Sequence, residues 1–155
     1  TDITHCSKEI LFTTPDKTLI VESIEDYIRK NIIIRSADKE LLERNFHEIL
    51  NMIGKVTPND PEPMINLFAW HENEEWQIVI FPRRQHRPWQ FFAEGADNIL
   101  FSPGCVDFAG LIISPRKADF NRLDVPLLRD LFGQLTLTDE QFNNLRFMIH
   151  DLRMS

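Results

Sequence analysis

A short basic and aromatic stretch stands out in the sequence, because Phe81 to Phe92 reads FPRRQHRPWQFF and contains no carboxylate. The planar guanidinium group of arginine donates in a fork that matches phosphate oxygens. Pro82 and Pro88 restrict the backbone on either side of the basic residues. Four side chains of this stretch are therefore candidate contacts to an anionic ligand: Arg83, Arg84, His86 and Arg87. The alternative is that the arginines pair with some of the 24 acidic residues and serve the fold alone.

The histidines and cysteines form no recognisable catalytic or metal-binding motif. No two of the five histidines lie two or four residues apart, which excludes the usual zinc-protease pattern. Cys6 and Cys105 have no partner at ligand spacing, so we expect no metal site. Gly104 and Gly110 fit neither a phosphate-binding loop nor a dinucleotide fingerprint, and we expect no cofactor.

Composition indicates one globular domain over residues 1–155, with 43% hydrophobic and 26% charged residues. Apolar runs such as Ile32–Ile34 are too short to span a membrane, and residues 1–9 do not resemble a signal peptide. With only two cysteines, a cytoplasmic protein is the expectation. The net charge of −7 argues against nucleic acid as a partner, but it is compatible with a small phosphorylated ligand held by local arginines.

Apolar alternation predicts a mainly antiparallel sheet. Strands are expected over residues 10–13, 17–21, 28–35, 64–70, 76–81, 98–101 and 108–114. The clearest pair is the hairpin formed by 64–70 and 76–81, joined by a polar turn. Because hairpin connections imply antiparallel pairing, and because helices interrupt and close the chain, the fold class is α+β with helices flanking the sheet.

Three longer helices are predicted. Residues 38–53 carry an amphipathic pattern, with Ser36 as the expected N-cap and Gly54 as the expected end. Asp124 is placed to cap a second helix that runs to about Leu135. Thr138 begins a capping-box pattern for the last helix of the chain.

Three segments together resemble a known enzyme group: INLFAWHENEEWQIVIFPRRQH, DFAGLIISPRKADF and TLTDEQFNNL. They are similar, over roughly residues 63–145, to the carboxy-terminal half of diadenosine tetraphosphate phosphorylases (ATP adenylyltransferases) and GDP-L-galactose phosphorylases. Both belong with galactose-1-phosphate uridylyltransferase in the histidine-triad-like superfamily. The resemblance implies a histidine-triad-like half whose substrate-contacting positions include Asn66, Arg83 and Lys117.

The resemblance also implies a nucleotidyl-transfer or phosphorolysis reaction on nucleoside polyphosphates or nucleotide sugars. In that superfamily a histidine of the amino-terminal half attacks phosphorus, beside groups that neutralise the phosphoryl charge. This chain has no histidine-x-histidine or histidine-x-glutamine pair, so no catalytic residue is assigned to it. We expect the carboxy-terminal part of a longer protein, inactive alone, with the missing amino-terminal half as its partner.

Two other interpretations stay open at this point. The chain can be a non-catalytic nucleotide-binding domain with the same fold, or a protein-interaction domain whose arginines are structural. If a partner half is missing, apolar residues meant for that half face solvent, and the chain is then expected to form homo-oligomers.

Overall fold

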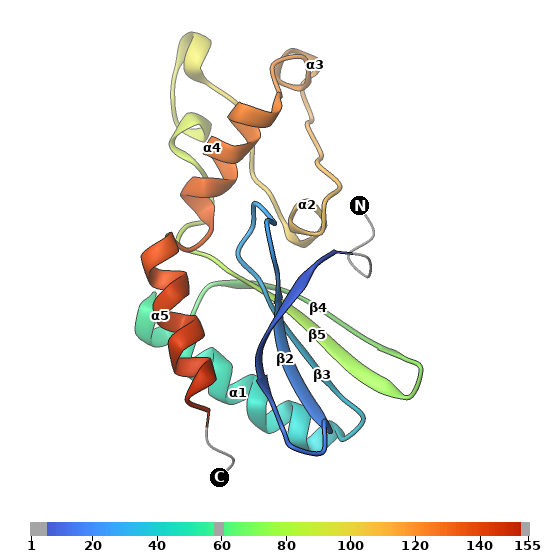
Figure 1. The fold of residues 1–155 in the computed structure, drawn as a ribbon. Helices are drawn as coiled ribbons and strands as arrows, with labels where there is room; N and C mark the ends of the chain where they lie inside the picture. Colours follow the sequence, from blue (N-terminus) through green and yellow to red (C-terminus); the bar gives the residue numbers. More distant parts are fainter. Residues whose placement is uncertain (1–5, 58–60, 153–155) are drawn as a thin grey trace.

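The computed structural model describes residues 6–57 and 61–152. They form an α+β domain on one five-stranded antiparallel sheet with strand order β1-β2-β3-β5-β4, which confirms the predicted class (Figure 1). The strands are β1 (Lys8–Thr13), β2 (Leu19–Ile24), β3 (Ile32–Ser36), β4 (Ile65–Glu72) and β5 (Glu75–Pro82). The longer helices are α1 (Lys39–Val56), α4 (Val125–Leu135) and α5 (Asp139–His150). The short helices are η2 (Trp89–Phe91), η3 (Gly95–Asp97), α2 (Cys105–Phe108) and α3 (Lys117–Phe120).

Helices α1 and α5 cover one face of the sheet (Figure 1). Each presents buried apolar residues three, four or seven positions apart, which is the spacing of one helical face. These residues are Leu42, Ile49 and Ile53 of α1 and Phe142, Leu145 and Ile149 of α5. They pack against the apolar side chains of the strands and make the first hydrophobic core. Among the described residues, no helix has both the length and the apolar character to cross a membrane.

A second core lies on the opposite face of the sheet, below α2 and α4. Because side chains alternate along a strand, Val79 and Phe81 of β5 point to this face. Aromatic rings connect the layers, since the centroids of Phe81 and Phe108 lie 5.6 Å apart and those of Phe108 and Phe132 lie 5.4 Å apart. Phe108, at the end of α2, is fully buried and sits at the centre of this core.

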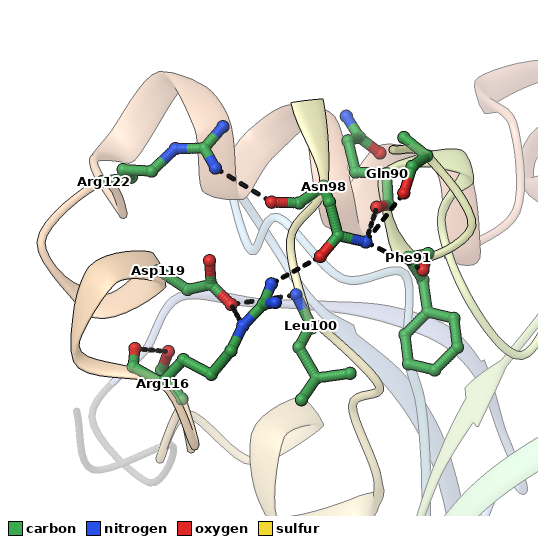
Figure 2. A network of polar contacts seen from close by, with 9 residues as sticks. Gln90, Phe91, Asn98, Leu100, Arg116, Asp119 and Arg122 are labelled. Atoms are coloured by element: carbon green, nitrogen blue, oxygen red, sulfur yellow. Dashed lines mark hydrogen bonds and ion pairs between the residues drawn. The ribbon is translucent and has the colours of Figure 1, made fainter. Parts of the chain in front are cut away.

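Residues 89–124, here called the lobe, connect β5 to α4 and are held together by a polar network (Figure 2). The Asn98 amide donates to three backbone carbonyls, those of Gln90, Phe91 and Ala93. The buried Asp119 carboxylate accepts from Leu100 N at 3.0 Å and from Arg116 Nε at 2.6 Å. Arg116 Nη2 also donates to Asn98 Oδ1 at 2.7 Å. One network thus satisfies the backbone of a segment that contains little regular structure.

The strands expected at 98–101 and 108–114 are wrong. Backbone N–H groups in these segments donate within the lobe, as Ile99 N does to Gln90 O and Ile113 N does to Asp107 Oδ1. Residues 105–108 form the short helix α2 instead. Several apolar residues of these segments pack in the second core. No neighbouring strand of the described sheet pairs with them.

The predicted hairpin and the three longer helices are confirmed, with changes at the ends of α1. Asp38 is the N-cap, because its side chain accepts from Leu41 N at 3.0 Å. Ser36 instead ends β3, where its hydroxyl donates to Thr18 O at 2.6 Å. The helix continues through Gly54 to Val56 and ends at Thr57, whose N–H donates to Ile53 O.

Candidate functional site: the arginine loop

The basic stretch forms a loop at the carboxyl end of β5, and we call residues 83–88 the arginine loop. Its backbone is fixed on two sides. Arg83 N donates to Met64 O next to β4, and Arg84 N donates to Leu135 O at the end of α4, each at 2.8 Å. The loop therefore starts from a strand in the middle of the sheet and is held against a helix terminus, which suits it to position side chains.

Arg83 lies beneath the loop with only 5% of its surface exposed. Its guanidinium group donates to four oxygens: Asn66 Oδ1 at 3.3 Å, Pro103 O at 3.0 Å, Gln85 O at 3.2 Å and His86 O at 2.6 Å. It also lies over the Phe108 ring, 4.9 Å from the centroid. Burial lowers the pKa of Arg83 below its ordinary value, and the charge of Asp107 opposes part of that effect. Arg83 folds the loop back over the second core.

Arg84 and Arg87 are exposed and each is anchored by part of its guanidinium group. Arg84 donates to Gly133 O at 2.8 Å and to Thr136 O at 2.7 Å, where the negative end of the α4 dipole favours a cation. Arg87 Nε donates to Ser102 Oγ at 3.0 Å, and the guanidinium carbon lies 4.2 Å from the centre of the Phe91 ring. These contacts therefore hold the guanidinium groups of Arg84 and Arg87 in fixed orientations at the protein surface.

In the described part of the chain, the arginines of the loop make hydrogen bonds rather than ion pairs. Within residues 6–57 and 61–152, none of the ion pairs includes Arg83, Arg84 or Arg87. Elsewhere cations do pair, as Arg35 does with Glu22 at 3.2 Å and Lys30 with Asp139 at 2.6 Å. Among the described residues these arginines donate to carbonyl, amide and hydroxyl oxygens instead, and whether the loop serves a ligand or the fold alone stays a prediction. The loop remains a concentration of positive charge on an acidic protein.

A groove of about 880 Å³ adjoins the loop between α1 and the start of β4. Its wall is mixed, since Phe46, Leu50 and Ile65 are apolar whereas Asn51 and Glu62 are polar, and His86 reaches it from the arginine loop. His47 of α1 also lines it. This volume is within the usual range of small-molecule sites, and an apolar wall with a few polar groups is their usual lining.

The remaining predicted site residues occupy two different places. Asn66 lies in β4, is 8% exposed and accepts the hydrogen bond from Arg83, so the structure brings these two positions together. Lys117 is exposed at the first residue of α3 in the lobe. Figure 1 draws α3 well apart from the end of β5, so the structure does not bring Lys117 to the arginine loop.

Sequence reasoning missed a second buried guanidinium group. Arg29, 5% exposed, donates to Tyr27 Oη at 3.0 Å and lies 4.1 Å from the centre of the Phe132 ring. Tyr27 in turn donates to Phe108 O at 2.9 Å. Burial lowers the pKa of Arg29. A single arginine between Ile28 and Lys30 gives no sequence signal, because only the tertiary fold places it over a ring.

No candidate metal centre is formed by the described residues, since no three His, Cys, Asp or Glu side chains gather in them.

Fold and site together define a single-sheet α+β domain that presents an arginine-rich loop at a strand end. Residues 4–154 match the family model described as GDPGP1-like, C-terminal domain. The chain belongs to this family, which confirms the resemblance to the carboxy-terminal part of the GDP-L-galactose phosphorylase group. The links to diadenosine tetraphosphate phosphorylases and to the histidine-triad-like superfamily stay predictions. Searches of curated proteins and of solved structures give no significant match.

Proposed function

We propose that this domain supplies phosphate-contacting side chains to a phosphorylase-like protein that acts on a nucleotide sugar. A GDP-hexose is the substrate class that family membership favours. The histidine that attacks phosphorus is expected outside this chain. The observation that carries the proposal is the arginine loop, whose guanidinium groups form no ion pair with a carboxylate among the described residues.

The three arginines of the loop have two different roles in this proposal. Arg83 is buried and acts from beneath, by fixing the backbone at Gln85 and His86. Arg84 and Arg87 are exposed and contact the diphosphate. A guanidinium group has five N–H donors; the described contacts use two of them on Arg84 and one on Arg87. The donors that remain are held in a fixed fork that suits the oxygens of a diphosphate.

The groove beside the loop offers a place for the planar base. Phe46 and Leu50 provide apolar wall, and His86 of the arginine loop lines the same groove. In this arrangement His86 and His47 contact the bound nucleotide and do not attack phosphorus, since neither belongs to a histidine pair. Asn66 supports Arg83. A role for Lys117 requires substrate that reaches the lobe, and it stays a prediction.

The test is GDP affinity, measured by calorimetry on the natural polypeptide that carries this domain. Arg87→Gln removes one charge without touching the buried Arg83, and Arg44→Gln removes the same charge at an exposed residue of α1 that does not line the groove. A charge-assisted hydrogen bond contributes about 1.5–3 kcal/mol, so Arg87→Gln is expected to weaken GDP binding roughly ten- to hundredfold. Arg44→Gln is expected to leave it within about twofold. Equal effects of the two variants, or none, contradict the proposal.

A further inference from the structure

An exposed aromatic ring stands directly after the arginine loop. Trp89 is the first residue of η2, and 56% of its surface is exposed. A single exposed apolar residue is ordinary in a folded protein. Trp89 differs in two respects, because hydrogen bonds fix the segment that carries it and because it lies beside the proposed phosphate contacts.

The backbone of Trp89 is held against the last turn of α4. Trp89 N donates to Gln134 Oε1 at 2.9 Å. The next residue, Gln90, is buried, and its side chain donates to Asp130 Oδ2 at 2.7 Å and accepts from Gln134 Nε2 at 2.9 Å. These contacts fix η2, so the indole ring is presented from a preorganised backbone.

The two exposed arginines of the loop are anchored at the same place. The side chain of Arg84 donates to two carbonyls of residues 133–136, the segment at the end of α4 that also holds Trp89. Arg87 lies two residues before Trp89, and its guanidinium carbon lies 4.2 Å from the centre of the Phe91 ring in the same η2. An anion bound by Arg84 and Arg87 is therefore adjacent to Trp89.

A hydrogen-bond acceptor lies next to this segment as well. Gln134, which accepts from Trp89 N, donates in turn to Asp130 Oδ2 at 3.1 Å, and Asp130 is exposed on α4. The two oxygens of a carboxylate have about four lone-pair sites, so Asp130 can accept further hydrogen bonds. A hexose matches this combination, because its C–H groups suit the negative face of an aromatic ring and its rim carries hydroxyl donors.

The groove proposed for the base lies on the other side of the loop. The groove is lined by α1, which packs in the first core, whereas α4 packs in the second core on the opposite face of the sheet. His86 lines the groove and Trp89 contacts α4, with Arg87 between them in the chain. A nucleotide sugar has the same order of parts, namely base, diphosphate and hexose.

We propose that Trp89 stacks on the hexose of the nucleotide sugar and that Asp130 accepts a hydrogen bond from one of its hydroxyl groups. The α4 side of the arginine loop is then the hexose subsite. The inference rests on the proposed function, because the diphosphate has to lie on Arg84 and Arg87. It assigns to Trp89 a contact that acts on the hexose and not on the base.

The test uses ligands that carry either the base or the hexose. GDP is titrated by calorimetry, and glucose 1-phosphate and mannose 1-phosphate by ligand-observed NMR, on the natural polypeptide that carries this domain. Trp89→Leu is expected to weaken binding of the tighter hexose 1-phosphate at least about fivefold and to leave GDP affinity within about twofold. Trp89→Tyr keeps an aromatic face and is expected to bind both ligands within about twofold of the unsubstituted protein.

Trp76→Leu is the matched control. Trp76 is also partly exposed, at 36%, but it lies near the start of β5, at the opposite end of that strand from the arginine loop. This variant is expected to change neither affinity. The melting temperatures of the Trp89 variants are compared first and are expected to stay within about 3 °C, because the indole is exposed.

Three results overturn the proposal. The first is hexose 1-phosphate binding that is absent from the unsubstituted protein or unchanged in Trp89→Leu. The second is an equal loss of GDP and hexose 1-phosphate affinity, which assigns the ring to the base or to the phosphates. The third is a loss that Trp89→Tyr shows in full, since the aromatic face is then not what binds.

Arg87→Gln in the same titrations separates this proposal from the proposed function. GDP binding that Arg87→Gln weakens, together with hexose 1-phosphate binding that ignores Trp89, contradicts the hexose subsite and supports the function. Hexose 1-phosphate binding that depends on Trp89, together with GDP binding that ignores Arg87, does the reverse.

Discussion

Arg83 Nη1 donates to Asn66 Oδ1 at 3.3 Å, so a side chain at the end of β5 is joined to one in the neighbouring edge strand β4. The same guanidinium group reaches the carbonyls of Gln85 and His86. The conformation of the arginine loop is therefore set from below, by a cation that solvent hardly reaches. This relationship separates the residues that shape the loop from those that face a ligand, and the two groups are expected to respond differently to substitution.

Arg83→Ala is expected to destabilise the fold by about 2–4 kcal/mol, because it removes several hydrogen bonds and leaves buried carbonyl groups unsatisfied. The midpoint of urea unfolding reports this, provided the slope of the transition is unchanged. Arg87→Ala is the control and is expected to cost no more than about 0.5 kcal/mol, since Arg87 is exposed. If Arg83→Ala melts like the unsubstituted chain while GDP binding is lost, Arg83 contacts the ligand directly.

Substitutions of Arg29 test how much a buried cation lowers the free energy of unfolding. Its Nε atom is buried without a hydrogen-bond partner in the described structure, and its charge is stabilised by two aromatic rings, by the Tyr27 hydroxyl and by the charge of Asp107. Arg29→Met keeps most of the volume and removes the desolvated charge, so stability is expected to stay within about 1 kcal/mol or to rise. Arg29→Ala leaves a cavity and is expected to cost about 2–4 kcal/mol. Equal losses in both variants contradict this account and show that the guanidinium group itself is required for stability.

The network around Asp119 predicts a dependence on pH. Burial alone raises the pKa of Asp119, but the hydrogen bonds from Arg116 and Leu100 N, with the positive charge of Arg116, outweigh it and hold this pKa below its ordinary value. Such a carboxylate stabilises the fold above its unfolded-state pKa of about 3.9, and the contribution is lost as pH falls through the folded pKa. Asp119→Asn is expected to cost about 1–2 kcal/mol at pH 7.

The check is chemical denaturation of the two proteins across the acid range. The difference between Asp119→Asn and the unsubstituted chain is expected to shrink below about pH 4, where the carboxylate takes up its proton. A difference that is the same at pH 7 and at about pH 3 shows that the ionised carboxylate is not what holds the lobe together.

The 155-residue chain is expected to release no GDP from a GDP-hexose in the presence of phosphate, because it carries no histidine pair of the kind the resemblance requires. The longer natural polypeptide is expected to convert the two substrates to GDP and hexose 1-phosphate. Liquid chromatography of both reactions, beside a no-enzyme control, makes the comparison. Turnover by rigorously purified 155-residue chain contradicts this expectation and places a catalytic group within it.

The sequence by itself determined the elements that depend on interactions between residues close together in the chain. The β4–β5 hairpin follows from two apolar runs separated by a polar turn, and Asn73 and Glu74 adopt the left-handed backbone that a two-residue hairpin turn needs. The capping box of Thr138 and Gln141 fixed the start of α5 in the same way. The family could also be predicted from the sequence, because its strand, loop and helix segments occur in a recognisable order.

Only the tertiary structure decided how the basic residues are used. Nothing in the pattern of adjacent arginines distinguishes Arg83, which is buried over Phe108, from Arg84, which reaches the end of α4. The strands predicted at 98–101 and 108–114 in the lobe are wrong for a related reason. Whether an apolar segment such as 98–101 becomes a strand depends on a neighbouring strand with which it can pair. The backbone of this segment instead hydrogen-bonds to side chains, as Leu100 N does to Asp119. Hydrogen-bond partners that lie far apart in sequence are brought together only by the folded chain, so periodicity alone does not reveal them.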